Sequence, residues 1–178
     1  MNVREGATSD ERRRIAVTSP LDVCAFVDEL DAEAVGEIFL ADGERGLGTV
    51  FVEHGKICWA AARGMARRFT ELLVANTGAS SEVVQRVIMD CIVERAPLGE
   101  RLLQAQVVDA QQLRSTILQH TAESLSAACA DPSSGIWSPR RLRGYASRFA
   151  FDTEEVLAEV VRRCSPTEGA RRNVDGRL

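Results

Sequence analysis

Residues 36–60 have the sequence GEIFLADGERGLGTVFVEHGKICWA, in which short β-forming runs alternate with turns. The β-forming runs are rich in Ile, Phe, Val or Trp and cover residues 36–41, 48–52 and 57–61. Between them lie two short connections, and Gly55 in the second can adopt the positive φ that a tight hairpin requires. Strands joined by such short connections pair antiparallel. This stretch therefore predicts a β-meander.

Apolar residues at helical spacing precede and follow the meander in the sequence. Ser19 is a favourable N-cap and Pro20 fits the first position of a helix. Further helices are expected from Arg67 to Gly78, through a helical block at about 79–130, and after Asp152 or Thr153, with a short strand at Ile136-Trp137. The pattern predicts an α+β fold in which an antiparallel sheet of about four or five strands packs against helices, with the helical block as an insert.

The length of 178 residues suits one domain with tails. Residues 1–17 are mostly polar and charged, which predicts a flexible N-terminal arm. Residues 18–164 are expected to form a single domain, and the polar residues 165–178 a disordered tail.

Composition narrows the class of protein. A net charge of −4 provides no overall attraction to nucleic acid or to an anionic membrane. The N-terminal residues contain no apolar run, and no stretch is long enough to span a bilayer. The cysteines are five in number and widely spaced, unlike a secreted disulfide framework, at Cys24, Cys58, Cys91, Cys129 and Cys164. We expect a cytoplasmic protein without membrane insertion.

The residues that carry enzyme or metal chemistry are sparse. No Ser or Cys stands in a recognisable nucleophile motif beside His54 or His120. Cys58 lies four residues after His54, but a second pair of zinc ligands is absent from the sequence. The glycine-rich stretch 43–48 precedes a strand instead of a helix, so it is interpreted as a turn and not a phosphate cradle. The sequence predicts no enzymatic activity, cofactor or metal.

Two arginine clusters are the candidate partner-binding residues. Arg63, Arg67 and Arg68 stand where a strand gives way to a helix, and the second cluster, in a loop, contains Arg140, Arg141, Arg143 and Arg148. One interpretation is a solvated rim neutralised by nearby acids. The other is a surface for an acidic partner or anion, because the guanidinium fork suits carboxylates and phosphates. The sequence leaves both open.

The ordered set of motifs resembles the PATAN domain, a bacterial domain of unknown function found beside response-regulator receiver domains. Gly36, Gly48, Gly55 and Ala60 occupy the glycine and alanine positions of its strand–strand–turn–strand pattern, and the resemblance covers about residues 19–164. Within the helical block, residues 98–120 are similar to the helical N-terminal domain of type II secretion and type IV pilus ATPases.

The resemblance implies a non-enzymatic protein–protein interaction module in bacterial signal transduction or motility regulation. The implied partners are a response regulator, a kinase, a small GTPase or a motility ATPase. This chain lacks a receiver-type phosphoacceptor, so any phosphorelay input is expected from a partner chain. A regulator that senses a small anionic ligand or nucleotide is the alternative function, and a weak DNA-binding protein the third.

The apolar content of the helical block also predicts contact with a second molecule. Residues 83–125 hold more apolar positions than one small sheet can cover. Homodimerisation through this block, or docking of a partner helix on it, would bury the surplus. The sequence does not separate these two outcomes.

Overall fold

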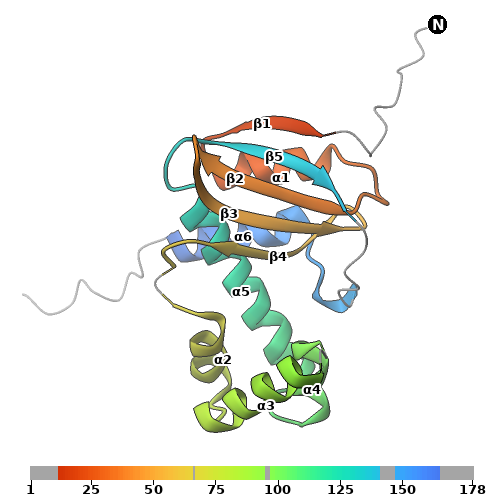
Figure 1. Cartoon of the computed structure of the whole chain (residues 1–178), viewed down its shortest axis with the longest axis vertical. Coiled ribbons are helices and arrows are strands. Elements are labelled where there is room, and N and C mark those ends of the chain that lie inside the picture. Colours follow the sequence, from red (N-terminus) through yellow and green to blue (C-terminus); the bar gives the residue numbers. More distant parts are fainter. Residues whose placement is uncertain (1–11, 66, 95–96, 141–146, 165–178) are drawn as a thin grey trace, which may run out of the picture.

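The computed structural model describes residues 12–65, 67–94, 97–140 and 147–164. It confirms an α+β fold with a five-stranded antiparallel sheet in the order β1-β5-β2-β3-β4 (Figure 1). The strands are β1 (Arg13–Val17), β2 (Gly36–Asp42), β3 (Arg45–Glu53), β4 (Lys56–Ala62) and β5 (Ser133–Pro139). The helices are α1 (Pro20–Asp28), α2 (Phe69–Thr77), α3 (Ser81–Glu94), α4 (Leu98–Gln104), α5 (Ala110–Ala128) and α6 (Thr153–Cys164), with a 3-10 turn at Ser147–Phe149. None of these helices combines the length and apolar character needed to cross a membrane.

The predicted meander is confirmed as β2, β3 and β4. Gly43 and Gly55 in its two turns have φ of 56° and 66°, a conformation that glycine adopts without steric cost. His54, beside Gly55, also has a positive φ of 52°. Strand β5 inserts next to β2, on the side away from β3, and so joins the meander to β1.

Helices α1, α5 and α6 cover one face of the sheet and enclose the core (Figure 1). Ile38, Leu40 and Trp137 from the central strands are fully buried there. At Gly48 a Cβ would lie 2.9 Å from the Cβ of Ala128 and 2.6 Å from the backbone oxygen of Ala61. Glycine at this position therefore lets the end of α5 approach the sheet closely.

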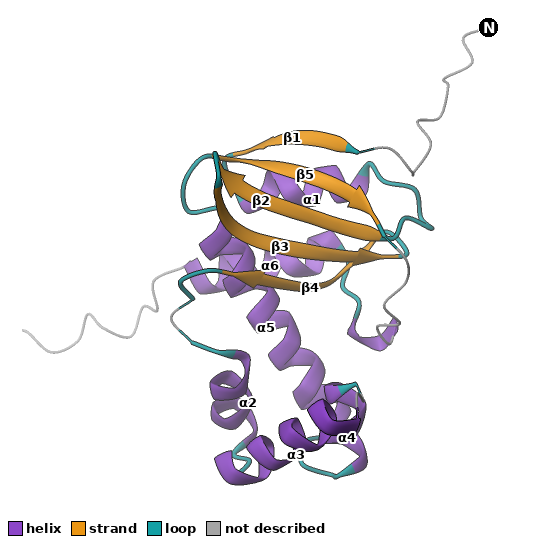
Figure 2. Ribbon diagram, viewed as in Figure 1, coloured by secondary structure: helices purple, strands orange, loops and turns teal. Residues whose placement is uncertain are grey.

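A helical lobe stands off the sheet and consists of α2, α3, α4 and the N-terminal half of α5 (Figure 2). Leu72, Leu102 and Leu113 are fully buried within it. Its limits differ from the predicted insert at 79–130. The preceding helix α2 belongs to the lobe because it packs on α3 and α5. The C-terminal half of α5 instead packs on β3 and β4, so one continuous helix serves both halves.

The prediction of a flexible arm over residues 1–17 is wrong for Arg13–Val17, which pair with β5 as strand β1. Val17 is buried, and the Arg13 guanidinium lies 4.8 Å from the centroid of the Phe26 ring. Arg13 also forms an ion pair of 3.2 Å with Glu29. Burial of Val17 and packing of the Arg13 side chain on Phe26 stabilise this edge strand, although its sequence is rich in charged residues. Residues 1–11 and 165–178 lie outside the described residues.

Candidate partner-binding surface

The face of the sheet opposite the helices, called here the outer sheet face, carries an apolar centre. The strand register aligns Ile136, Phe39, Thr49 and Ala61 across β5, β2, β3 and β4, and the exposed Arg14 of β1 lies beside Ile136 at the edge of this row. The Phe39 side chain is 44% exposed, while Ile136 is half-buried. In Figure 1 the helices α1 and α6 and the upper part of α5 lie behind the sheet, and α2, α3 and α4 lie below it, so no described helix covers this face.

The neighbouring row adds an aromatic residue and an ion pair. Phe51 of β3 stands opposite Glu37 of β2 and is half-buried. The Glu37 carboxylate accepts hydrogen bonds from Nη2 and Nε of Arg140, at 2.8 and 3.0 Å. An apolar centre with a charged margin is the usual anatomy of a protein interface.

The Phe39 ring lies over Gly46 of β3, which has no side chain. A Cβ at Gly46 would lie 2.9 Å from the tip of the Phe39 ring, so glycine there makes room for the ring. The ring borders a hollow whose other walls are Glu44, Gly46, Gly48, Thr49, Ala61 and Arg63. The exposed Arg63 forms no ion pair within the described part of the chain, and its guanidinium is thus available to a carboxylate from outside.

Each arginine cluster contributes one member to the margin of this face, and the two lie toward opposite ends of the strands. Arg63 follows β4, and Arg140 follows β5, where its backbone N–H donates to Val35. The sequence alone does not show that both border one face, because this depends on β5 inserting beside β2. The remaining described arginines of both clusters lie elsewhere.

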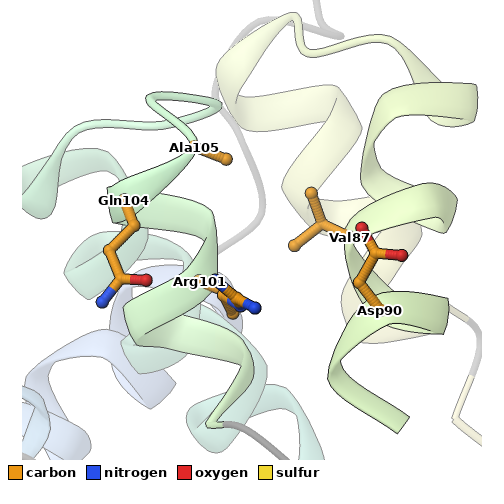
Figure 3. A pocket seen from close by; sticks show the side chains of 5 residues that line it. All are labelled: Val87, Asp90, Arg101, Gln104 and Ala105. Atoms are coloured by element: carbon orange, nitrogen blue, oxygen red, sulfur yellow. The ribbon is translucent and has the colours of Figure 1, made fainter. Parts of the chain in front are cut away.

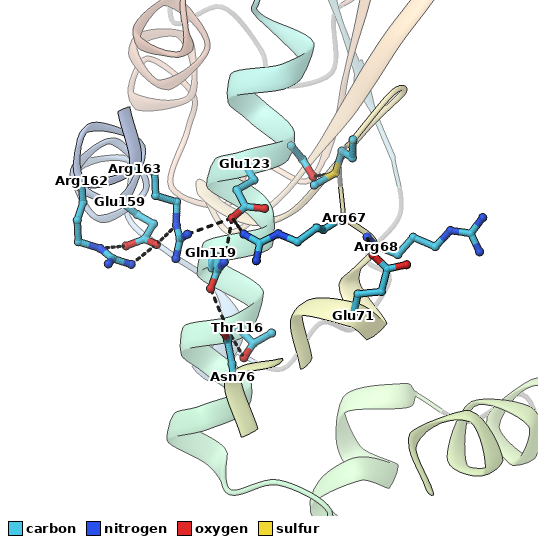
Figure 4. A network of polar contacts seen from close by, with 12 residues as sticks. Arg67, Arg68, Glu71, Asn76, Thr116, Gln119, Glu123, Glu159, Arg162 and Arg163 are labelled. Atoms are coloured by element: carbon cyan, nitrogen blue, oxygen red, sulfur yellow. Dashed lines mark hydrogen bonds and ion pairs between the residues drawn. The ribbon is translucent and has the colours of Figure 1, made fainter. Parts of the chain in front are cut away.

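The Arg67 side chain points toward α5 and binds a carboxylate there (Figure 4). Its Nη2 lies 2.9 Å from Oε1 of Glu123. The same oxygen accepts from Gln119 at 2.8 Å and from Arg163 of α6 at 3.1 Å. This arginine is therefore part of an internal network that ties the β4–α2 connection to α5 and α6, as the neutralised-rim interpretation expects.

The network extends into α6 and the helical lobe. Glu159 accepts from Arg162 and Arg163, and these bonds hold its pKa below the ordinary value although burial alone would raise it. On the other side, Nδ2 of Asn76 donates to Oε1 of Gln119 at 2.8 Å, linking α2 to α5. The chain of contacts thus joins the two halves of the molecule.

Arg68 and Arg148 have different surroundings. Arg68 begins α2, and Figure 4 shows its side chain directed away from the network. Arg148 pairs with Glu100 of α4 at 2.5 Å and lies 5.0 Å from the centroid of the Phe149 ring. These contacts keep Arg148 away from the outer sheet face. Arg141 and Arg143 lie outside the described residues.

His120 is enclosed where the sheet meets the helical lobe. Its ring centroid lies 4.3 Å from that of Trp59 and 5.5 Å from that of Phe69. Burial lowers the pKa of His120, and among the described residues its Nδ1 has no hydrogen-bond partner. The imidazole is therefore neutral near pH 7 and acts as a packing residue. His54, by contrast, is exposed in its turn and lies 3.2 Å from Glu33.

Three buried cysteine side chains are held in the protonated form. Burial raises the pKa of Cys24, Cys58 and Cys129 to about 12, so their thiols are weak nucleophiles at neutral pH. Within the described ranges, no group of three or more His, Cys, Asp or Glu side chains is arranged to hold a metal ion.

Helix α3 has apolar residues on two sides. Val84, Val87 and Cys91 are buried, whereas Ile92 is 65% exposed. A shallow groove between α3 and α4 follows the buried side, with Val87, Asp90, Arg101, Gln104 and Ala105 around it (Figure 3). The spacing of Ile88, Met89, Ile92 and Val93 is the signal that could have revealed the second side.

Comparisons with protein-family models, curated proteins and solved structures found no match to this chain. The resemblance to PATAN domains therefore stays a prediction from the motifs in residues 36–60.

Proposed function

We propose that this protein is a non-enzymatic protein–protein interaction module whose contact surface is the outer sheet face. The observation that carries the proposal is the exposed Phe39, set in an apolar centre with Arg63 and the Arg140–Glu37 pair at its margin. Aromatic and arginine side chains contribute most of the binding energy at many protein interfaces.

The chemistry of this face suits a partner with an apolar anchor and an acidic neighbour. The anchor would lie against Phe39 and Ile136, which no described helix covers. A carboxylate of the partner would pair with Arg63, whereas Arg140 already has Glu37. Exclusion of water from such a centre strengthens the ion pairs around it.

The proposed setting is bacterial signalling or motility control in the cytoplasm. The PATAN-like pattern of Gly36, Gly48, Gly55 and Ala60 supports it. Under this proposal the partner is a response regulator, a kinase, a small GTPase or a motility ATPase, and the chain transmits a state of that partner by binding it.

Affinity capture from native cell extract tests the proposal with three versions of the protein. Phe39→Arg places a charge in the apolar centre, and Leu21→Arg is the control, because Leu21 is 60% exposed on α1 behind the sheet. We expect one or more proteins to be retained by the wild type and by Leu21→Arg and to be lost with Phe39→Arg.

Identical capture by all three versions would show that the outer sheet face is not the contact surface. If no protein is retained and a nucleotide or small anion raises the unfolding temperature, the ligand-sensing alternative is favoured instead. Matching unfolding temperatures of the three purified versions establish that the substitutions act at the surface.

A further inference from the structure

The two edges of the sheet differ in how they are protected. At the β4 edge, the backbone of Ile57 pairs with that of Phe151 through hydrogen bonds of 3.0 and 2.9 Å, and the pairing of β4 with β3 contains a register shift. At the other edge, β1 pairs with β5 along its whole length without a register shift. Figure 2 shows no described helix or strand beyond β1. A regular, unpaired edge is a template for another strand.

The hydrogen-bond pattern of the sheet shows which backbone groups of β1 are free. The Arg140 N–H donates to the Val35 carbonyl, and this pair continues the register of β5 with β2. Bonded pairs alternate along an antiparallel ladder, so β5 uses its even-numbered residues for β2 and its odd-numbered residues for β1. The N–H and C=O groups of Arg14 and Ala16, which stand opposite even-numbered residues, therefore point away from β5 toward the open edge.

The side chains at this edge are basic. Arg14 is exposed at the margin of the outer sheet face, beside Ile136, and Arg12 is exposed one residue before β1 begins. Among the described residues neither of these two guanidinium groups forms an ion pair, whereas that of Arg13 is bound to Glu29. A guanidinium group binds carboxylates through charge-assisted hydrogen bonds, and opposite charges on paired strands stabilise the pairing. The β1 edge therefore favours a strand with acidic side chains.

We propose that the β1 edge binds an extended acidic segment of a partner protein, which adds a strand to the sheet. The backbone of the segment bonds to Arg14 and Ala16, and its carboxylates pair with the free guanidinium groups. A second copy of β1 would instead bring its own arginines against Arg14, and like charges on paired strands are unfavourable. The chain's own residues 1–11 have only Val3 and Thr8 as β-forming residues, so they are poorly suited to this edge.

Hydrogen exchange of the purified full chain, followed by NMR, tests the proposal with a synthetic peptide. The probe is a short peptide with blocked ends in which Glu and Val alternate, and a peptide in which Lys and Val alternate is its control. In the free protein we expect the amides of Arg14 and Ala16 to exchange quickly, because they point away from β5. The acidic probe is expected to slow the exchange of both amides, and the basic peptide to leave them unchanged.

Variants separate the backbone contribution from the charge. Ala16→Pro removes an N–H that β5 does not use, and proline is tolerated at such edge positions, so we expect binding of the probe to be lost with the fold intact. Arg14→Glu is expected to weaken binding about threefold to tenfold. Arg86→Glu, the same charge change at an exposed position of α3, should bind like the wild type. Phe39→Arg should also retain the probe, which separates this edge from the proposed contact through Phe39.

Four results would overturn the proposal. Two of them are no protection by the acidic probe, and equal protection by the basic peptide. The third is slow exchange of the Arg14 and Ala16 amides in the free protein at every concentration, which would assign the edge to the chain's own residues 1–11. The fourth is slow exchange that appears only as the protein concentration rises, which would assign the edge to a second copy. If Ala16→Pro does not fold, the comparison of Arg14→Glu with Arg86→Glu still decides the role of charge.

Discussion

The sheet half and the helical lobe differ in how completely they use their apolar residues. In the sheet half, three helices cover one face, and the large side chains of the central strands there have almost no exposure. In the lobe, α3 buries Val84 and Val87 but leaves Met89, Ile92 and Val93 in water. The comparison indicates that the largest buried side chains are concentrated in the sheet half, while the lobe leaves more apolar surface exposed.

The two halves meet along α5, which has 19 residues and belongs to both. Glu123 and His120 of this helix lie at the junction, one in an ion-pair network and the other against Trp59. Substitutions should therefore lower the free energy of unfolding most in the sheet core, less at the junction and least on the lobe surface.

The largest effect is expected from Trp137→Ala in the sheet core. Trp137 is 1% exposed and packs against Phe26 with 6.2 Å between ring centroids. Removal of the indole leaves a cavity, and we expect a loss of about 3–5 kcal/mol in the free energy of unfolding, measured by denaturant titration. A loss below about 1 kcal/mol would mean that the core is not concentrated in the sheet half.

A smaller effect is expected from Glu123→Gln at the junction. Glu123 accepts from Arg67, Arg163 and Gln119, and its side chain is only 21% exposed. We expect a loss of about 1 kcal/mol, discounted for the exposure of the arginines, together with faster amide hydrogen exchange in α2. Glu100→Gln, which removes the exposed pair with Arg148, is the matched control and should leave α2 unchanged. Equal exchange in both variants would argue against a coupling network.

The junction also predicts a pH dependence through His120. Burial lowers the pKa of this residue from 6.5, and Glu123 offsets part of that effect. Since the folded state favours the neutral ring, stability from this site is complete above pH 6.5 and is lost as the pH falls through the folded-state pKa. We expect the unfolding temperature to decrease from about pH 7.5 to about pH 5 in the wild type. The His120→Phe variant should show a weaker decrease, and an equal one would exclude His120 as its source.

The smallest effect is expected from Val93→Ala on the exposed side of α3. Val93 is 79% exposed, so truncation should change the free energy of unfolding by no more than about 0.5 kcal/mol in dilute protein. Denaturant titration at low concentration is the measurement. A loss comparable to that of a core truncation would show that Val93 is covered within one copy.

The part of the sheet that could be predicted is the part whose β-forming runs and glycine turns follow one another directly in the sequence. Residues 36–62 form the strands expected from their glycine-bounded runs, and Gly78 ends α2 in the left-handed conformation that its position predicts. Strand β1 was missed because Arg13 and Arg14 suggest a solvated arm. Its pairing partner, β5, lies more than a hundred residues away, so no local pattern reveals it.

The candidate site was predictable only in part. The sequence singled out Arg63 and Arg140, but not the common face to which the strand order brings them. Arg67 was grouped with Arg63, and its partner Glu123 is 56 residues further along the chain. Phe39 was interpreted only as a β-forming residue, since alternation does not say which face of a sheet lacks helices.

The central claim is that the outer sheet face binds a protein partner, and photo-crosslinking in living cells tests it most directly. A photoreactive amino acid replaces Phe39 in one strain and Leu21 in another, and both chains are recovered after irradiation. The account predicts a covalent adduct with a second kind of polypeptide from position 39 and none from position 21. No adduct at position 39, equal adducts at both positions, or an adduct only with another copy of this chain would contradict it.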